Sequence, residues 1–279
     1  MCKFFNNFLA HFSLNVYFCG RIINFQHHLY MNSTVLSKLG LAVNHISVDC
    51  VVLGLAESTL YVLLIKRKVE EDGNIVYDYK LPGGLIYSDE DLDDAAARVL
   101  KELTGVRNLH MMQFKAFGSR NRISSRDAKW LKETLDDNVQ ALVTVGYVAL
   151  GRIGRKLNLH NAGHEVCWMP VNEAFTLDLA FDHKTIISEA LKAVRHNADA
   201  DPAILYTLLP NKFTALQLRM LYEFVYNKEI DVRNFKKKMM QLTYIEPLEE
   251  YEQGVAHRAA RYYRFNRVKY KKSRRGGTE

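Results

Sequence analysis

One segment, residues 81–106, constrains the fold of this chain more than any other. It reads LPGGLIYSDEDLDDAAARVLKELTGV. Gly83 and Gly84 follow Pro82 and interrupt regular structure, and a run of acidic residues then stands where the positive end of a helix dipole favours negative charge. Gly105 stands where a helix commonly ends in the left-handed conformation. The segment therefore predicts a loop and one helix that ends just before Gly105.

The spacing within this segment resembles the Nudix motif. The motif spans 23 positions, here residues 84–106. Seven residues match it, namely Gly84, Glu90, Arg98, Leu100, Glu102, Gly105 and Val106. The resemblance implies that this part of the chain folds as a Nudix-like α/β/α sandwich around a mixed sheet.

Two positions depart from the motif, because Val99 and Leu103 stand where family enzymes carry glutamates. Those enzymes use three carboxylates to hold divalent cations, and magnesium prefers oxygen ligands. Only Glu102 remains, four residues after its natural helical ion-pair partner Arg98. We therefore expect no catalytic residue, no metal site and no required cofactor. The residual motif is Gly84, Glu90, Arg98, Glu102 and Gly105. The alternative is a magnesium-dependent Nudix hydrolase of a nucleoside-diphosphate compound, with a substitute carboxylate from another loop.

Glycines and arginines near the motif are the candidate ligand-binding residues. The glycines either let the backbone approach a phosphate or simply form the turn. Guanidinium groups suit anionic or polyhydroxyl ligands. The predicted ligand-binding set is Arg67, Gly83, Gly84, Arg120 and Arg122.

The remaining pattern up to residue 201 predicts strands and one further helix. Buried strands are expected at 46–55, 60–68, 109–117, 139–150 and 165–171. Residues 70–80 and 118–138 read as polar loops, the second with a helical turn. An amphipathic helix begins near Asp182 and is followed by a polar linker at 197–201.

Charge separates the chain into two parts. Residues 1–200 hold 22 Lys+Arg and 22 Asp+Glu, whereas residues 201–279 hold 16 and 9. A basic module beside a balanced body suggests a polyanion partner, although a solvated basic tail is the alternative. The first 30 residues lack both the unbroken apolar run of a signal peptide and a membrane span. We expect them to be poorly ordered, with Met31 as a possible true start.

The basic module has the layout of a winged helix. Thr214 and Gln217 are spaced as a capping box that opens one helix, and Asp231 is the N-cap of a second. A hairpin around Gly254 follows. The fold class is α+β, with an N-terminal Nudix-like sandwich and a C-terminal winged helix-turn-helix. The predicted divisions are an extension at 1–43, a Nudix-like domain at 44–196, a winged helix at 197–272 and a basic tail at 273–279.

The second helix of this module combines a basic face with an apolar stripe. Val232, Phe235, Met239 and Leu242 should face the core. The opposite side carries cations for phosphates and polar groups for base edges, as a recognition helix does. The predicted DNA-binding residues are Arg233, Asn234, Lys236, Lys237, Lys238 and Gln241, with Arg258 and Arg261 from the hairpin.

The combination over residues 44–268 resembles the Nudix-related bacterial transcriptional regulators. In that family the Nudix-like domain senses a small molecule and the winged helix binds double-stranded operator DNA as a homodimer. Some members respond to ADP-ribose and control NAD metabolism, and others sense arabinose or related sugars. The resemblance implies a cytoplasmic regulator without a membrane partner, whose effector is a sugar or an ADP-ribose-like nucleotide-sugar.

Overall fold

The computed structural model describes residues 15–18, 21–24, 44–56, 59–107, 109–135, 139, 141–153, 165–256 and 258–275. It consists of two units, Met1–Val43 and Asn44–Glu279. In the first unit, β1 (Asn15–Phe18) and β2 (Arg21–Asn24) pair in antiparallel fashion. Most of the extension at 1–43, including Met31, lies outside the described residues, so the expectation of poor order there stays a prediction.

The second unit is built on a mixed sheet, as predicted, but the sheet has seven strands instead of the five expected. The main path runs β5-β4-β3-β8-β7, with β6 paired to β3 and β9 paired to β4. Only β3 and β8 run parallel among these pairs. The strands are β3 (Asn44–Ala56), β4 (Thr59–Glu71), β5 (Asn74–Lys80), β6 (Gly83–Leu85), β7 (Met111–Phe117), β8 (Ala141–Arg152) and β9 (Val166–Pro170).

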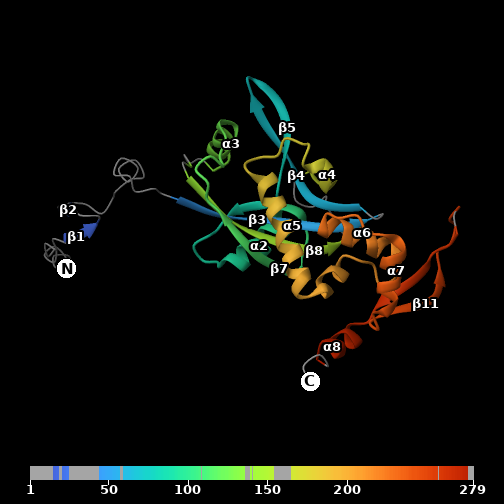
Figure 1. The fold of residues 1–279 in the computed structure, drawn as a ribbon. Coiled ribbons are helices and arrows are strands. Elements are labelled where there is room, and N and C mark those ends of the chain that lie inside the picture. The colour runs from blue at the N-terminus through green and yellow to red at the C-terminus, as the bar shows by residue number, and fades with distance from the viewer. Residues whose placement is uncertain are drawn as a thin grey trace, which may run out of the picture. The chain divides into compact units, whose positions relative to one another are not determined.

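Helices cover both faces of this sheet, because side chains along β3 alternate between two cores. Val48, Cys50 and Val52 join the cluster that includes α2 (Leu92–Thr104), and Val51, Leu53 and Leu55 join the cluster that includes α5 (His183–Ala200). Figure 1 shows α5 lying across the strands. The α/β/α sandwich predicted from the motif is therefore confirmed. Helix α2 begins at its N-cap Asp91 and ends at Gly105, whose φ is 72°.

Two segments predicted as polar loops contain regular structure. Residues 70–80 belong to a β4–β5 hairpin, whose turn residues Asp72 and Gly73 have φ of 51° and 78°. Asp-Gly is a preferred pair for a two-residue hairpin turn, and that signal was present in the sequence. Residues Ser125–Leu135 form helix α3. A further short helix, α4 (Val171–Ala174), follows β9.

The predicted polar linker at 197–201 is wrong in its first four residues. Helix α5 continues to Ala200, and a 3-10 helix, η1 (Pro202–Thr207), follows. Tertiary packing overrides the polar composition, because Val194 and Ala198 are almost completely buried. The predicted division between residues 196 and 197 thus falls inside one helix, and the domain limits remain a prediction.

The C-terminal part forms the predicted winged helix. Its sheet has the order β10-β12-β11. Both predicted caps are present: Thr214 and Gln217 form a capping box, and the Asp231 carboxylate accepts from the Asn234 N–H. The elements are β10 (Phe213–Thr214), α6 (Ala215–Tyr226), α7 (Val232–Gln241), β11 (Ile245–Tyr251), β12 (Arg261–Phe265) and α8 (Arg267–Arg275).

Helix α8 was not predicted, and it takes up residues 273–275 of the expected basic tail. Residues 276–279 lie outside the described residues. Among the described residues, no helix combines the length and the apolar character that crossing a membrane requires.

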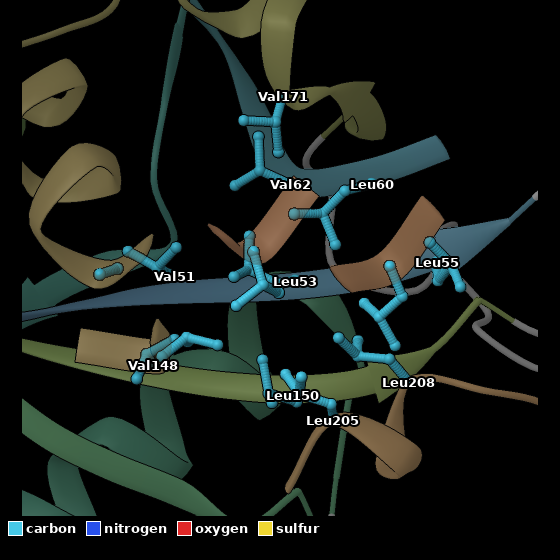
Figure 2. Close-up of a cluster of buried hydrophobic side chains, with 14 of the residues drawn as sticks. Val51, Leu53, Leu55, Leu60, Val62, Val148, Leu150, Val171, Leu205 and Leu208 are labelled. Atoms are coloured by element: carbon cyan, nitrogen blue, oxygen red, sulfur yellow. The ribbon is translucent and has the colours of Figure 1, made fainter. Parts of the chain in front are cut away.

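The core of the winged helix is continuous with one face of the large sheet. Leu205 and Leu208, from η1 and just after it, belong to the same cluster as Leu53 and Leu150 of β3 and β8. Figure 2 shows these side chains together. The cluster extends to Leu218 of α6. The two parts of the second unit therefore share apolar contacts and are not joined by a free tether.

Candidate functional site

Arg98 holds the loop before α2 in place. Its guanidinium donates to both carboxylate oxygens of Glu90 at 2.7 and 2.5 Å, and to the Leu85 carbonyl at 2.9 Å. The expected ion pair between Arg98 and Glu102 is present at 3.2 Å. It is more exposed than the pair between Arg98 and Glu90. Hydrogen bonding from Arg98 lowers the pKa of Glu90 to about 2. Glu90 is therefore an ion-paired residue that ties the loop to α2.

The face of α2 that carries metal ligands in family enzymes is apolar here. Val99 is 2% exposed, and Leu103 packs against the same cluster. A Cβ placed on Gly84 would lie 3.1 Å from Val99 Cγ2, so the loop closes directly over the valine. Glu102 projects away toward solvent, paired to Arg98. These residues do not fit a divalent cation, since a hard cation requires several oxygen ligands at one point.

Gly83 is required by a close approach of the Asp49 side chain. A Cβ at Gly83 would lie 1.9 Å from Asp49 Oδ1. Burial acts to raise the pKa of Asp49, but His183 and Arg122 outweigh it and hold that pKa below its usual value. His183 Nε2 lies 3.6 Å from Asp49, and its Nδ1 accepts from the Leu81 N–H at 3.0 Å. The first residue of α5 is thus bonded to the start of the motif loop.

Two of the predicted ligand-binding arginines are buried in internal ion pairs. Arg67 donates to Asp78 at 2.8 and 2.5 Å and to Asp127 at 2.8 Å. Arg122 donates to Asp182 at 2.8 and 3.1 Å. Each is only 4% exposed. Neither is the open contact that was expected, because both side chains bind carboxylates in the interior. Arg67 keeps one nitrogen, Nη1, without a hydrogen-bond partner among the described residues. Arg120 is exposed, in the loop before α3.

Sequence reasoning missed an aromatic and cationic cluster beside Arg67. Trp130 of α3 lies over the Arg67 guanidinium at 4.9 Å, and Phe181 lies 5.5 Å from it. Lys80 Nζ is 5.8 Å from the Trp130 ring. Burial lowers the pKa of Lys80 to about 8. The only available signal was Lys80 next to the motif, because Trp130 is brought there by a helix that was read as a loop.

Helix α7 presents to solvent all six of the DNA-binding residues that were predicted on it. Those residues are Arg233, Asn234, Lys236, Lys237, Lys238 and Gln241, and all are exposed. On the inner side Met239 is buried, and Phe235 and Leu242 are half-buried. Val232 differs from the prediction, since it is 60% exposed. It stands at the first position of the helix, next to the outward-facing turn.

The β11–β12 hairpin, the wing of the winged helix, presents less unpaired positive charge than expected. Arg261 donates to the Leu248 carbonyl at 2.7 Å and is ion-paired with Glu249, so it closes the hairpin. That differs from the direct DNA contact predicted for it. Arg258 is exposed near the hairpin turn.

Comparison with known proteins agrees with both parts of this architecture. The NUDIX domain model matches residues 43–190, which is more than half of the chain. The chain belongs to the NUDIX domain family. Residues 205–265 match the NrtR DNA-binding winged helix domain, the second part of the architecture predicted from the sequence.

Named relatives resemble this chain over most of its length. A protein of Acinetobacter baylyi, the ADPR responsive transcriptional repressor NtrR, is 26% identical over 222 residues, covering 78% of this chain and 81% of that one. The crystal structure of Shewanella oneidensis NrtR has a TM-score of 0.56 at 25% identity and covers 79% of this chain and 94% of that one. The same protein complexed with a 27mer DNA has a TM-score of 0.58 at 23% identity, covering 81% and 95%.

Restoring a motif glutamate should unfold the NUDIX domain instead of creating a metal site. Val99→Glu would bury a carboxylate without a partner, which costs several kcal/mol. We expect a clear loss of melting temperature, not reversed by magnesium, whereas the exposed control Lys101→Glu stays close to wild type. A Val99→Glu protein of unchanged melting temperature would show that this face is not dry.

Arg67 should stabilise the fold through its two buried ion pairs. Arg67→Ala leaves Asp78 and Asp127 buried without their cation, and losing one partner of a buried pair costs roughly 3–5 kcal/mol. Denaturant unfolding should show that loss. Lys68→Ala, at the exposed neighbouring position, should change the free energy of unfolding by less than about 0.5 kcal/mol. Comparable effects of the two changes would contradict the ion-pair assignment.

Proposed function

We propose that this NUDIX family member is a ligand-responsive transcriptional repressor whose winged helix binds operator DNA. The observation that carries the proposal is the exposed face of α7, which bears four cations, one Asn and one Gln and no acid after Asp231. Cations contact phosphates, and amide side chains read base edges in the major groove. The name of the Acinetobacter baylyi relative and the DNA complex of Shewanella oneidensis NrtR support the same reading.

A two-fold symmetric operator requires a symmetric reader, so we propose that the protein acts as a homodimer. It would act in the cytoplasm, where operator DNA is found. The two reading helices would then enter successive major grooves on one side of the duplex.

We place the effector site at the interface between α3 and the sheet. The buried guanidinium of Arg67 has one nitrogen, Nη1, without a hydrogen-bond partner among the described residues. An unsatisfied buried donor costs about 1–3 kcal/mol, and a ligand oxygen would remove that cost. Lys80 and Trp130 flank the same point, where a cation and an aromatic face suit a polyhydroxyl ring.

The charge of this region favours hydroxyl groups over a diphosphate at the buried end. Its cations are Arg67, Lys80, Arg122 and Arg126. They face the carboxylates of Asp49, Asp78, Asp127 and Asp182, and Arg126 is also paired with Asp178 and Glu71. The carboxylates already neutralise these cations, so no positive charge is left to bind a diphosphate. We therefore propose a sugar effector, or a nucleotide-sugar of the ADP-ribose kind that inserts its sugar first.

We propose no metal-dependent hydrolysis, because Val99 and Leu103 fill the positions where the reaction needs carboxylates. The alternative predicts magnesium-dependent turnover of nucleoside-diphosphate compounds that Glu102→Gln abolishes. Assaying wild type and Glu102→Gln on such a panel separates the two functions.

Operator binding should depend on the α7 face. Arg233→Ala with Lys237→Ala removes two phosphate contacts, so the slope of log affinity against log salt should become shallower by roughly 2, with at least a tenfold loss of affinity. Fluorescence anisotropy with the DNA upstream of the protein's own gene measures both. The control removes two exposed lysines of the NUDIX domain, Lys132→Ala with Lys184→Ala. Equal affinities for the two variants would refute α7 as the reading helix.

Effector binding should raise the melting temperature and depend on Lys80. We would screen pentoses, other neutral sugars and ADP-ribose by thermal shift, since a ligand at about 100 times its Kd adds roughly 2.7 kcal/mol to stability. Lys80→Met keeps the length of the side chain but removes its charge, and should abolish the shift. Lys68→Met on the exposed side of β4 should retain it. A full shift in Lys80→Met would place the effector elsewhere.

A further inference from the structure

Helix α8 lies just beyond the part of the chain that matches the winged helix domain, which ends at residue 265. Its sequence, RVKYKKSRR, holds six cations and no acid. A run of charge of this kind is commonly a solvated tail. Here it forms a helix with a defined position on the winged helix, so its charges are held in place.

Tyr270 anchors α8 to the rest of the fold. Its side chain is 7% exposed, and its ring packs edge-on against Tyr244 at 4.9 Å. Its hydroxyl is hydrogen-bonded to Asp201, just after α5. The start of the helix is fixed as well, because Asn266 caps it through the Lys269 N–H at 3.0 Å and donates its own N–H to the Tyr244 carbonyl at 2.8 Å.

The cations of α8 divide between an inner and an outer side. Lys269 is ion-paired with Glu246 at 2.9 Å, and Arg274 lies 3.5 Å from Asp201, so both belong to the docked side with Tyr270. At 100° per residue the remaining positions share the opposite arc. That arc holds Arg267, Val268, Lys271, Lys272 and Arg275, all exposed.

Three cations on this outer arc are available to a partner. In the described part of the chain, Arg267, Lys271 and Lys272 have neither an ion pair nor a side-chain hydrogen bond. A membrane surface suits this arc poorly, because an interfacial helix needs an apolar face, and Val268 is the single large apolar residue on it. Double-stranded DNA suits it well, since its backbone carries one negative charge per about 1.7 Å.

We propose that α8 is a second DNA-contacting element, which binds the sugar-phosphate backbone flanking the half-site that α7 reads. This inference rests on the proposed function of α7 and extends it. Helix α8 follows directly from β12 and contacts Tyr244, in the connection between α7 and β11. The outer arc has no Asn or Gln, so the contact adds affinity and salt dependence without sequence preference.

The test compares two matched triple variants on two duplexes. The α8 variant is Arg267→Ala, Lys271→Ala and Lys272→Ala, in which alanine preserves helix propensity. The control removes the same charge from exposed positions of the NUDIX domain, Lys101→Ala, Lys132→Ala and Lys184→Ala. One duplex carries only the operator core, and the other extends about one helical turn beyond it on each side. Circular dichroism and melting temperature report whether each variant is folded.

We expect the α8 variant to bind the long duplex roughly 10–100-fold more weakly than the control at about 0.15 M salt, with a salt slope shallower by 2 to 3. On the short duplex the two variants should bind alike. Unchanged affinity on the long duplex would overturn the proposal, and so would equal losses on both duplexes or a loss of binding to anionic vesicles alone. Failure of wild type to bind either duplex would refute the function proposed for α7 as well, which separates the two outcomes.

Discussion

The apolar contact between η1 and the large sheet packs the winged helix against the NUDIX domain. Leu205 and Leu208 share one core with Leu53 and Leu150, and α5 lies across the same face. A packed interior is close to incompressible and transmits displacement instead of absorbing it. A displacement of α5 relative to the sheet would therefore be transmitted to the winged helix. A flexible linker would have removed that coupling.

The protein contains both buried cations that are ion-paired and exposed cations that face solvent. Arg67 and Arg122 are neutralised by carboxylates in the interior, where an unpaired charge is prohibitively costly. The cations of α7 and of the outer arc of α8 lie in solvent, where water stabilises their charge. The net charge of +7 therefore comes from residues 201–279 and not from the NUDIX domain.

Local signals were readable from the sequence, and tertiary partners were not. The Thr214–Gln217 capping box, the Asp231 cap and the end of α2 at Gly105 depend on residues within one turn of each other, and all three are present. The mixed sheet was expected from the resemblance of residues 84–106 to the Nudix motif.

The misses have a common physical cause. Arg67 looked available because its acidic partners Asp78 and Asp127 come from a hairpin and a helix that were both read as loops. Helix α5 ran through a polar stretch because the sheet and the winged helix bury one of its sides. Such outcomes depend on which elements pack together, and the periodicity of a single segment does not carry that information.

If the proposed effector site is right, the position of His183 would connect it physically to the winged helix. As the first residue of α5, it accepts a hydrogen bond from the Leu81 N–H and lies beside Asp49, which in turn contacts Arg122. Phe181, two residues earlier, packs against His183 with its ring tilted by 44° and lies over Arg67. A ligand at the proposed site, accepting from Arg67 beneath Trp130, would therefore lie close to groups that fix the start of α5. Ligands shift an equilibrium only through a difference in affinity between two states. The hydrogen bond to Leu81 is where that difference would act, because its geometry changes as soon as α5 moves relative to the motif loop.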